Sequence, residues 1–288
     1  MQTLDGWTVE GVQLARGAAA ARTYSLRRPH SAAPVTARPL RCERPEQRAR
    51  LLRETRALVD FAHPHVCRTY GVGRLHGRPC LVTERIDGTP LRDAQPTLDL
   101  ETKIEIMIQI ADAVRALHDA RIVHHSIMPH SIVLRSGLEA SGRAVDAVLV
   151  GFGLTCSDAS AAGQVLDDDV IAPTAYMAPE QIDAQPRAGD RLSDLYSLGA
   201  TFYHLVTGRA PFVADTAQRL IERVLVSDVP PPRAFDPVLP EALDALVLRC
   251  LARDRALRPA DASEIVHALR ALVVPRPLMR WLRRALPS

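Results

Sequence analysis

The segment ARIVHHSIMPHSIVLRSG, residues 120–137, concentrates side chains that could take part in chemistry. Four histidines lie in it or just before it: His118, His124, His125 and His130. Imidazole nitrogens are common metal ligands, so a cluster of this kind raises the question of a metal site. The four residues are divided among a helix end, a core position and a loop, however, and the pattern therefore predicts no shared metal site.

A run of three carboxylates, Asp167-Asp168-Asp169, is a second candidate. Such a run could hold a cation or imitate a phosphorylated loop. It lies within residues 154–177, which have no hydrophobic periodicity and are rich in small and polar residues. That composition predicts a mobile loop, and the simpler interpretation is a solvated acidic stretch.

Composition places the chain in an ordinary class of proteins. It has 288 residues, a net charge of +3 and 47% hydrophobic residues, which suffices for one large domain or two packed lobes. Lys103 is the only lysine, and the arginines are dispersed along the chain rather than clustered, so we expect no nucleic-acid partner.

Neither the cysteines nor the hydrophobic segments indicate an extracellular or membrane-spanning protein. The five cysteines are scattered without a Cys-x-x-Cys pair, which favours reduced thiols. The opening MQTLDGWTVEG lacks a basic-then-apolar signal pattern, and no stretch approaches the ~20 apolar residues that span a bilayer. We therefore expect a cytoplasmic protein.

The elements that must position these residues change character along the chain. Residues 34–40 and 79–83 have the pattern of strands. Between them, one face of a predicted helix carries Leu51, Leu52, Thr55, Leu58 and Val59. Turn residues in IDGTPL, residues 86–91, indicate a linker.

The second part of the chain is mainly helical. A helical period runs from Ile104 to Leu117, two short strands are predicted at 132–134 and 147–150, and a further helix is expected from Leu195 to Val206. Gly208 is placed to end that helix. Asp261 and Glu264 resemble a capping box that begins the last long helix.

Several motifs in the correct order carry a resemblance over residues 7–272. They are AHPHVCRTYGVG (62–73), HGRPCLVTERIDGTPL (76–91), TAYMAPEQI (174–182), RLSDLYSLGATFYHLVTGRAPF (191–212) and CLARDRALRPADASEI (250–265). Together they resemble a bacterial Ser/Thr protein kinase domain. The resemblance implies an α+β, two-lobed fold: a small β-rich N-lobe with one helix (1–85), a larger α-helical C-lobe (86–272) and a basic tail (273–288).

The resemblance also implies a catalytic loop with the pattern H-R-D-L-x-x-x-N. His124 matches its first position, but Ser126 stands where the catalytic aspartate is expected. A carboxylate there orients the substrate hydroxyl and accepts its proton, an effect of ~10²–10⁴-fold, and serine has no comparable basicity. His125, Met128 and Ser131 replace the arginine, the basic residue and the metal-binding asparagine of the pattern.

The second metal position is altered as well. The family's D-F-G reads Gly151-Phe152-Gly153 here, so the residue in place of the chief magnesium ligand has no side chain. Magnesium is bound by oxygen ligands, normally carboxylates. We therefore expect no well-formed magnesium site.

The parts that would hold phosphates are reduced too. The glycine-rich loop reads LARGAAAARTY, with Gly17 as its only glycine. Arg38 occupies the position of the phosphate-binding lysine, and a planar guanidinium is not equivalent to an ammonium group. Glu54, the helical partner of that position, is present, so an ion pair with Arg38 is expected as a structural link. If a nucleotide bound at all, ATP would bind weakly, through Gly17, Arg38, Glu54, Thr83 and Glu84.

The positions that organise the scaffold are retained. They are His124, Phe152, Gly153, Glu180, Asp194 and Arg258, with Leu58 expected to stack with His124 and Phe152, and Glu54 also kept. Glu180 and Arg258 are expected to form a buried ion pair. A retained frame with degraded chemistry predicts a pseudokinase, a scaffold or allosteric regulator that binds proteins. The alternative is a weak or unconventional ATP-dependent Ser/Thr kinase or nucleotide transferase.

The tail offers a further contact surface. In RPLMRWLRRALPS the apolar residues of 278–286 fall on one helical arc and the arginines on the other. Such a helix could pack on its own domain, enter a partner's groove or lie on the inner face of the membrane.

Overall fold

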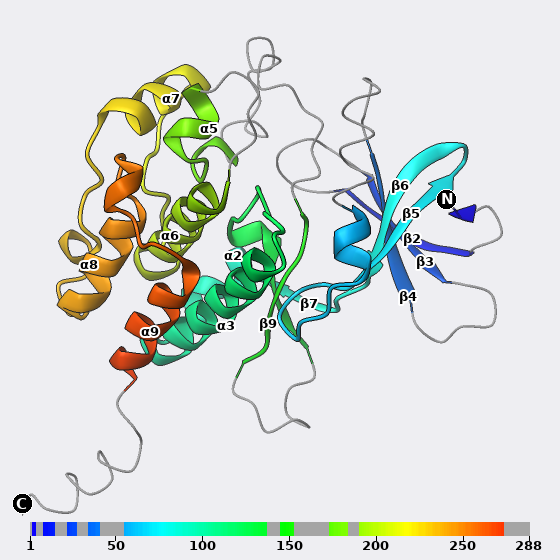
Figure 1. The fold of residues 1–288 in the computed structure, drawn as a ribbon, viewed down its shortest axis with the longest axis horizontal. Coiled ribbons are helices and arrows are strands. Elements are labelled where there is room, and N and C mark those ends of the chain that lie inside the picture. Colours follow the sequence, from blue (N-terminus) through cyan, green and yellow to red (C-terminus); the bar gives the residue numbers. More distant parts are fainter. Residues whose placement is uncertain are drawn as a thin grey trace, which may run out of the picture.

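The computed structural model describes residues 2–3, 8–14, 22–27, 34–40, 55–136, 145–152, 173–183 and 190–273. Figure 1 shows a β-sheet lobe and a helical lobe side by side. This is the α+β, two-lobed architecture expected from the sequence.

The N-terminal lobe is built on one sheet. Its six described strands are β1 (Gln2–Thr3), β2 (Thr8–Leu14), β3 (Arg22–Arg27), β4 (Pro34–Pro39), β5 (Thr69–Leu75) and β6 (Arg78–Glu84). Their order is β1-β5-β6-β4-β3-β2, and all neighbours are antiparallel except β1 and β5. Alternate residues of β4, Val35 and Ala37, are buried on one face, as period-two patterning requires.

The predicted helix before β5 is described from residue 55, and residues 55–59 are helical. Thr55 and Leu58 are buried, in agreement with the expected packed face. Val59 is 39% exposed, so its assignment to that face was wrong. Residue 59 is the last helical residue, and the chain turns away from the core there.

The stretch expected to be a plain linker, 86–91, is partly ordered as a strand. β7 (Gly88–Pro90) pairs antiparallel with β8 (Ile132–Arg135), which also pairs with β9 (Ala147–Leu149). A Cβ on Gly88 would lie 2.1 Å from the carbonyl oxygen of Leu134, so only glycine allows this approach. Turn-type residues concealed a pairing that depends on a strand more than 40 residues away.

The helical lobe is organised around α3 (Leu100–Asp119), which begins at Asp99, whose side chain accepts a hydrogen bond from the Thr102 N–H. The other helices are α2 (Leu91–Ala94), α5 (Pro179–Asp183), α6 (Arg191–Thr207), α7 (Ala217–Val226), α8 (Glu241–Cys250) and α9 (Ala262–Leu272). In Figure 1, α3 lies against α9 and the helices α6 and α8 stand beside them. The core between them is mostly aliphatic.

Two predicted helix ends are present. Gly208 ends α6 with φ of +77°, a conformation that favours glycine. Asp261 caps α9 by accepting from the Glu264 N–H, but the Glu264 carboxylate accepts from the N–H of Ala260 instead of returning to Asp261. The reciprocal bond of a capping box is therefore displaced by one residue.

The described cysteines, Cys67, Cys80 and Cys250, are free and buried. No helix among the described residues has the length and apolar character needed to cross a bilayer.

Candidate functional site

The loop that drew attention in the sequence is held by one buried carboxylate. Asp194, in the first turn of α6, accepts hydrogen bonds from the backbone N–H groups of His124 (2.7 Å) and His125 (2.8 Å). Its Oδ2 also lies 3.0 Å from Nε2 of His118 at the end of α3. Thus α6 fixes both the loop and the end of α3.

Asp194 keeps its negative charge in this setting. Burial alone would raise the pKa of this carboxyl, which is 1% exposed. The hydrogen bond from His118 and the donors of His124 outweigh burial, so the pKa of Asp194 lies below its usual value. The carboxylate is therefore a fixed anion beneath the loop.

His124 is a core residue. It is fully buried, and its ring lies 4.6 Å, centroid to centroid, from the ring of Phe152. Leu58 belongs to the same cluster of buried residues as Phe152. Burial lowers the pKa of His124 to about 4, so the imidazole is neutral near pH 7 and supports packing between the lobes.

This burial predicts that stability falls as the pH falls from 6.5 toward 4. In that window the unfolded chain binds a proton at His124 that the folded chain refuses, so protons favour unfolding. The contribution is roughly 3 kcal/mol at one pKa unit per ~1.4 kcal/mol. Urea unfolding at several pH values should give a shallower slope for His124→Gln, whereas His267→Gln, which alters an exposed histidine, should keep the wild-type slope. Equal slopes in all three proteins would contradict the prediction.

The two positions expected to hold metal ligands do come together. A Cβ built on Gly151 would lie 3.9 Å from the Cβ of Ser131. Gly151 is exposed and has φ of +75°, a conformation in which a side chain would be strained. The hydroxyl of Ser131 donates to the Met128 carbonyl (2.8 Å) and accepts from the Met128 N–H (2.9 Å), so it closes its own turn.

Magnesium does not fit the residues at this place. Ser131 has spent its one oxygen on the loop, Gly151 has none to offer, and Ser126 is a half-buried serine in place of a carboxylate. Throughout the described part of the chain, no group of three or more His, Cys, Asp or Glu side chains is arranged to hold a metal ion. The four histidines accordingly do not form a described metal cluster.

Arg38 joins the N-terminal lobe to the same place. From β4 its Nη2 donates a 2.7 Å hydrogen bond to the carbonyl oxygen of Phe152. Burial lowers the pKa of the guanidinium from its ordinary value. The group in the phosphate-binding position therefore contacts the backbone of the 151–152 segment.

The residues expected beside a nucleotide base have structural contacts of their own. Thr83 pairs with Thr36 and Thr69 within the sheet. The Glu84 carboxylate lies 3.5 Å from Nη2 of Arg135 and accepts from the Arg68 N–H at 3.4 Å. Glu84 thus links β6 to β8 across the hinge.

The predicted ion pair between Glu180 and Arg258 is present and bidentate. Arg258 Nη1 and Nη2 lie 2.7 and 2.9 Å from the two carboxylate oxygens of Glu180. The arginine side chain is fully buried and that of Glu180 is 20% exposed. Ser193 donates to the same carboxylate at 2.8 Å, so the start of α6 joins the pair.

A cavity of about 250 Å³ next to the loop involves residues that the sequence did not single out. His130 is hydrogen-bonded to Arg92 (2.7 Å), and Tyr176 Oη lies 2.7 Å from Nδ1 of His204. Burial lowers the pKa of His204 to about 4. Of these residues only His130 lay in the segment first noted, and the others are brought to it by α2, α6 and the 173–183 segment.

Some predicted site residues fall outside the described residues. They are Gly17, Glu54, Gly153, Asp167-Asp168-Asp169 and the tail, 278–286. The expected Arg38–Glu54 ion pair therefore stays a prediction.

Comparison with known proteins gives the family. The protein kinase domain model matches residues 16–269. The chain belongs to the protein kinase domain family, as the order of its motifs suggested.

The relatives are bacterial Ser/Thr kinases. The chain is 31% identical over 227 residues to the DNA damage-responsive serine/threonine-protein kinase RqkA of Deinococcus radiodurans, covering 76% of this chain and 32% of that protein. It is 29% identical over 239 residues to PknJ of Mycobacterium tuberculosis, covering 82% and 40%. The chain thus spans about a third of the length of the curated relatives it matches.

A solved structure with the same fold is the PknI kinase domain of Mycobacterium tuberculosis. The TM-score is 0.70 at 23% identity, covering 93% of this chain and 96% of that one. At this identity the likeness establishes the fold.

Proposed function

We propose that this member of the kinase family is catalytically inactive, a pseudokinase that acts as a scaffold or allosteric regulator by binding proteins. The observation that carries the proposal is the pairing of Gly151 with Ser131. These positions meet in space, yet the first has no side chain and the second has its hydroxyl bonded within its own turn. Phosphoryl transfer depends on metals and positioned charge, and this place provides neither.

Two further observations support it. Ser126 replaces the expected base, and Arg38 is bonded to the Phe152 carbonyl in place of a lysine poised for phosphates. In contrast, the contacts of Asp194 and of the Glu180–Arg258 pair keep the lobe organised without any nucleotide.

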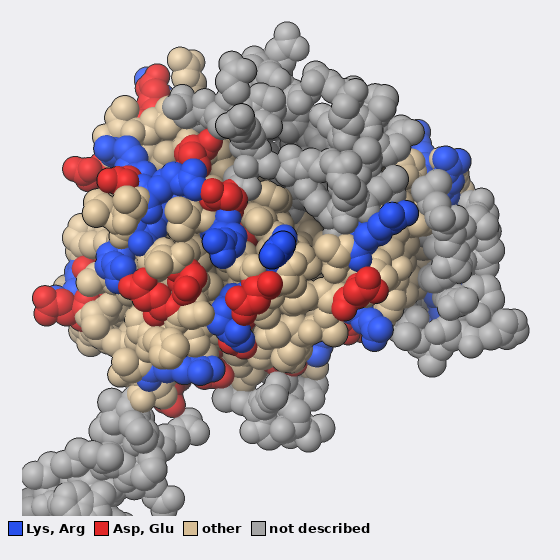
Figure 2. All heavy atoms as spheres, in the orientation of Figure 1, with Lys and Arg blue, Asp and Glu red and all other residues tan. Residues whose placement is uncertain are grey.

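A binding role also agrees with the surface. Figure 2 shows acidic and basic side chains intermixed over the described part of the helical lobe on this face. No single-sign field of the kind that draws nucleic acid covers it. We therefore place proteins first among the partners, while the contact through 278–286 with a partner groove or the inner membrane face stays a prediction.

The purified chain should show no magnesium-dependent phosphotransfer. Ser126→Asp should not create activity, because a restored base would still lack metal ligands and phosphate contacts. Radiolabelled phosphate transfer to itself and to a generic substrate measures the chemistry. Thermal-shift titration with ATP, with and without magnesium or manganese, should show at most weak binding.

An active relative such as PknJ, assayed in parallel, controls for the conditions. Robust metal-dependent transfer by the wild-type chain that disappears in Arg38→Ala would overturn the proposal and favour the alternative of an unconventional ATP-dependent kinase. The binding role is tested separately, by co-purification of partners from the source organism.

A further inference from the structure

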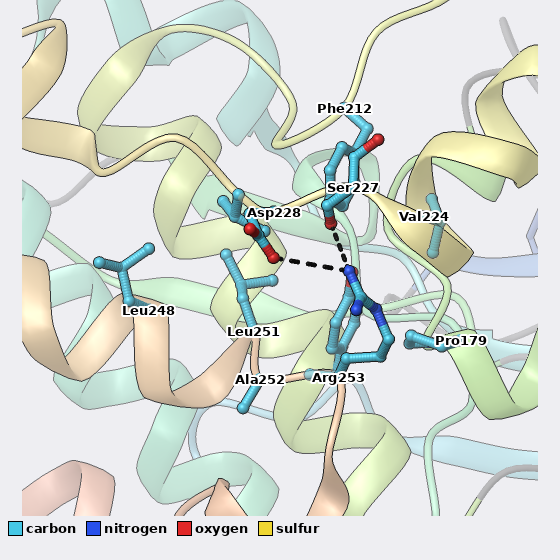
Figure 3. A pocket seen from close by; sticks show the side chains of 11 residues that line it. Pro179, Phe212, Val224, Ser227, Asp228, Leu248, Leu251, Ala252 and Arg253 are labelled. Atoms are coloured by element: carbon cyan, nitrogen blue, oxygen red, sulfur yellow. Dashed lines mark hydrogen bonds and ion pairs between the residues drawn. The ribbon is translucent and has the colours of Figure 1, made fainter.

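A second cavity, of about 180 Å³, lies away from the site described above, between α6, α7 and the end of α8. Figure 3 shows the side chains around it. Most of its walls are apolar: Pro179, Phe212, Val224, Leu248, Leu251 and Ala252. Arg253 extends toward Ser227 and Asp228, donating to the Ser227 carbonyl at 2.8 Å and lying 3.7 Å from the Asp228 carboxylate.

One polar side chain in the wall has nothing to bond. Tyr196 of α6 lines the cavity and is only 1% exposed, and its hydroxyl makes no hydrogen bond with any described residue. A buried tyrosine usually finds a partner for its hydroxyl, because an unpaired one costs free energy. Burial raises the pKa of Tyr196, so the group stays protonated and can both donate and accept.

The size of the cavity limits the occupant. A cavity of about 150 Å³ holds one benzene molecule, so about 180 Å³ suits one six-membered ring with a small substituent. An aliphatic side chain would fill the space but leave the Tyr196 hydroxyl unpaired. A phenol ring satisfies both conditions, since its hydroxyl can pair with that of Tyr196.

The surroundings indicate where such a ring comes from. Val213 and Val226 follow and precede cavity residues Phe212 and Ser227, and they are 50% and 73% exposed. Large exposed apolar side chains beside a pocket are typical of protein contacts, and tyrosine is a frequent anchor in them.

We propose that this cavity is a docking pocket for a tyrosine side chain of a protein partner. The inference deepens the proposed binding role and rests on it, but it does not depend on loss of phosphotransfer. The occupant would touch the anchor of the 173–183 segment, because the guanidinium of Arg258 lies 5.0 Å from the centre of the Tyr196 ring, and Pro179 precedes Glu180. Docking would thus stabilise the Glu180–Arg258 pair.

The test compares two probes that differ by one hydroxyl, N-acetyl-tyrosine amide and N-acetyl-phenylalanine amide. Their binding is followed through the NMR methyl signals of Val224, Leu248 and Leu251 in the full chain. Relative to the phenylalanine probe, the tyrosine probe should be favoured about three- to tenfold more by the wild type than by Tyr196→Phe, the effect of one net hydrogen bond. Removing an unpaired hydroxyl should not unfold the protein.

Filling the cavity gives an independent readout. Ala252→Leu should abolish binding of both probes, whereas Ala245→Leu, an exposed position on α8, should leave it intact. An unchanged preference in Tyr196→Phe, binding that survives Ala252→Leu, or no response of the methyl signals to either probe would each overturn the proposal. The phosphotransfer assay is unaffected by any of these results, so the two proposals fail separately.

Discussion

Replacing Arg258 by alanine is expected to lower the free energy of unfolding by about 3–5 kcal/mol. The substitution leaves the Glu180 carboxylate without its bidentate partner, and it also unpairs the carbonyls of Leu192 and Ala252, which accept from Arg258 at 3.0 and 2.8 Å. Because the arginine side chain is fully buried, water does not compensate for these losses as it does at the surface. Urea or thermal unfolding measures the change.

Arg219→Ala is the matched control. Arg219 pairs with Asp215 at 3.7 Å, but the two side chains are 69% and 91% exposed, so about 0–1 kcal/mol is expected. A double variant, Arg258→Ala with Glu180→Ala, should lose less than the sum of the single variants, because the second change removes the stranded charge. An Arg258→Ala effect no larger than that of Arg219→Ala would show that the pair does not anchor the lobe.

Asp194→Ala is expected to cost roughly 3–6 kcal/mol at pH 7, because it strands several buried donors at about 1–3 kcal/mol each. The donors are the N–H groups of His124 and His125 and Nε2 of His118. Denaturant unfolding measures the loss, and Asp119→Ala, at a position 68% exposed, should change stability by no more than about 0.5 kcal/mol.

The acid dependence of Asp194→Ala gives a second readout. The folded-state pKa of Asp194 lies below the unfolded value of 3.8, so its contribution is complete above that value and is lost as the pH falls through the folded-state pKa. The difference between wild type and Asp194→Ala should therefore shrink in strong acid. A difference that stays constant with pH would show that the carboxylate charge is not what holds the loop.

The sequence by itself determined the elements with strong local signals. The apolar period of residues 104–117 and the glycine at 208 are sufficient to predict α3 and the end of α6, because helix period and left-handed turns depend on neighbouring residues. The missing chemistry was also readable, since a glycine at 151 or a serine at 126 lacks a carboxylate wherever the fold places it.

Elements that depend on distant partners were predicted less well. Residues 86–91 contain turn chemistry, yet Gly88–Pro90 form a strand because β8 lies beside them. Val59 has the spacing of a buried residue but falls at the last turn of its helix, where no packed element covers it. Local patterns report conformation, whereas burial requires a neighbour supplied by the rest of the chain.

Only the tertiary structure decided what the retained positions do. It brings Gly151 beside Ser131, gives Arg38 the Phe152 carbonyl as acceptor, and leaves the Tyr196 hydroxyl unpaired in a cavity wall. Each of these contacts joins residues from separate strands, loops or helices. Such contacts follow from how the elements pack, and packing is cooperative over the whole domain, so no local pattern in the sequence could specify them.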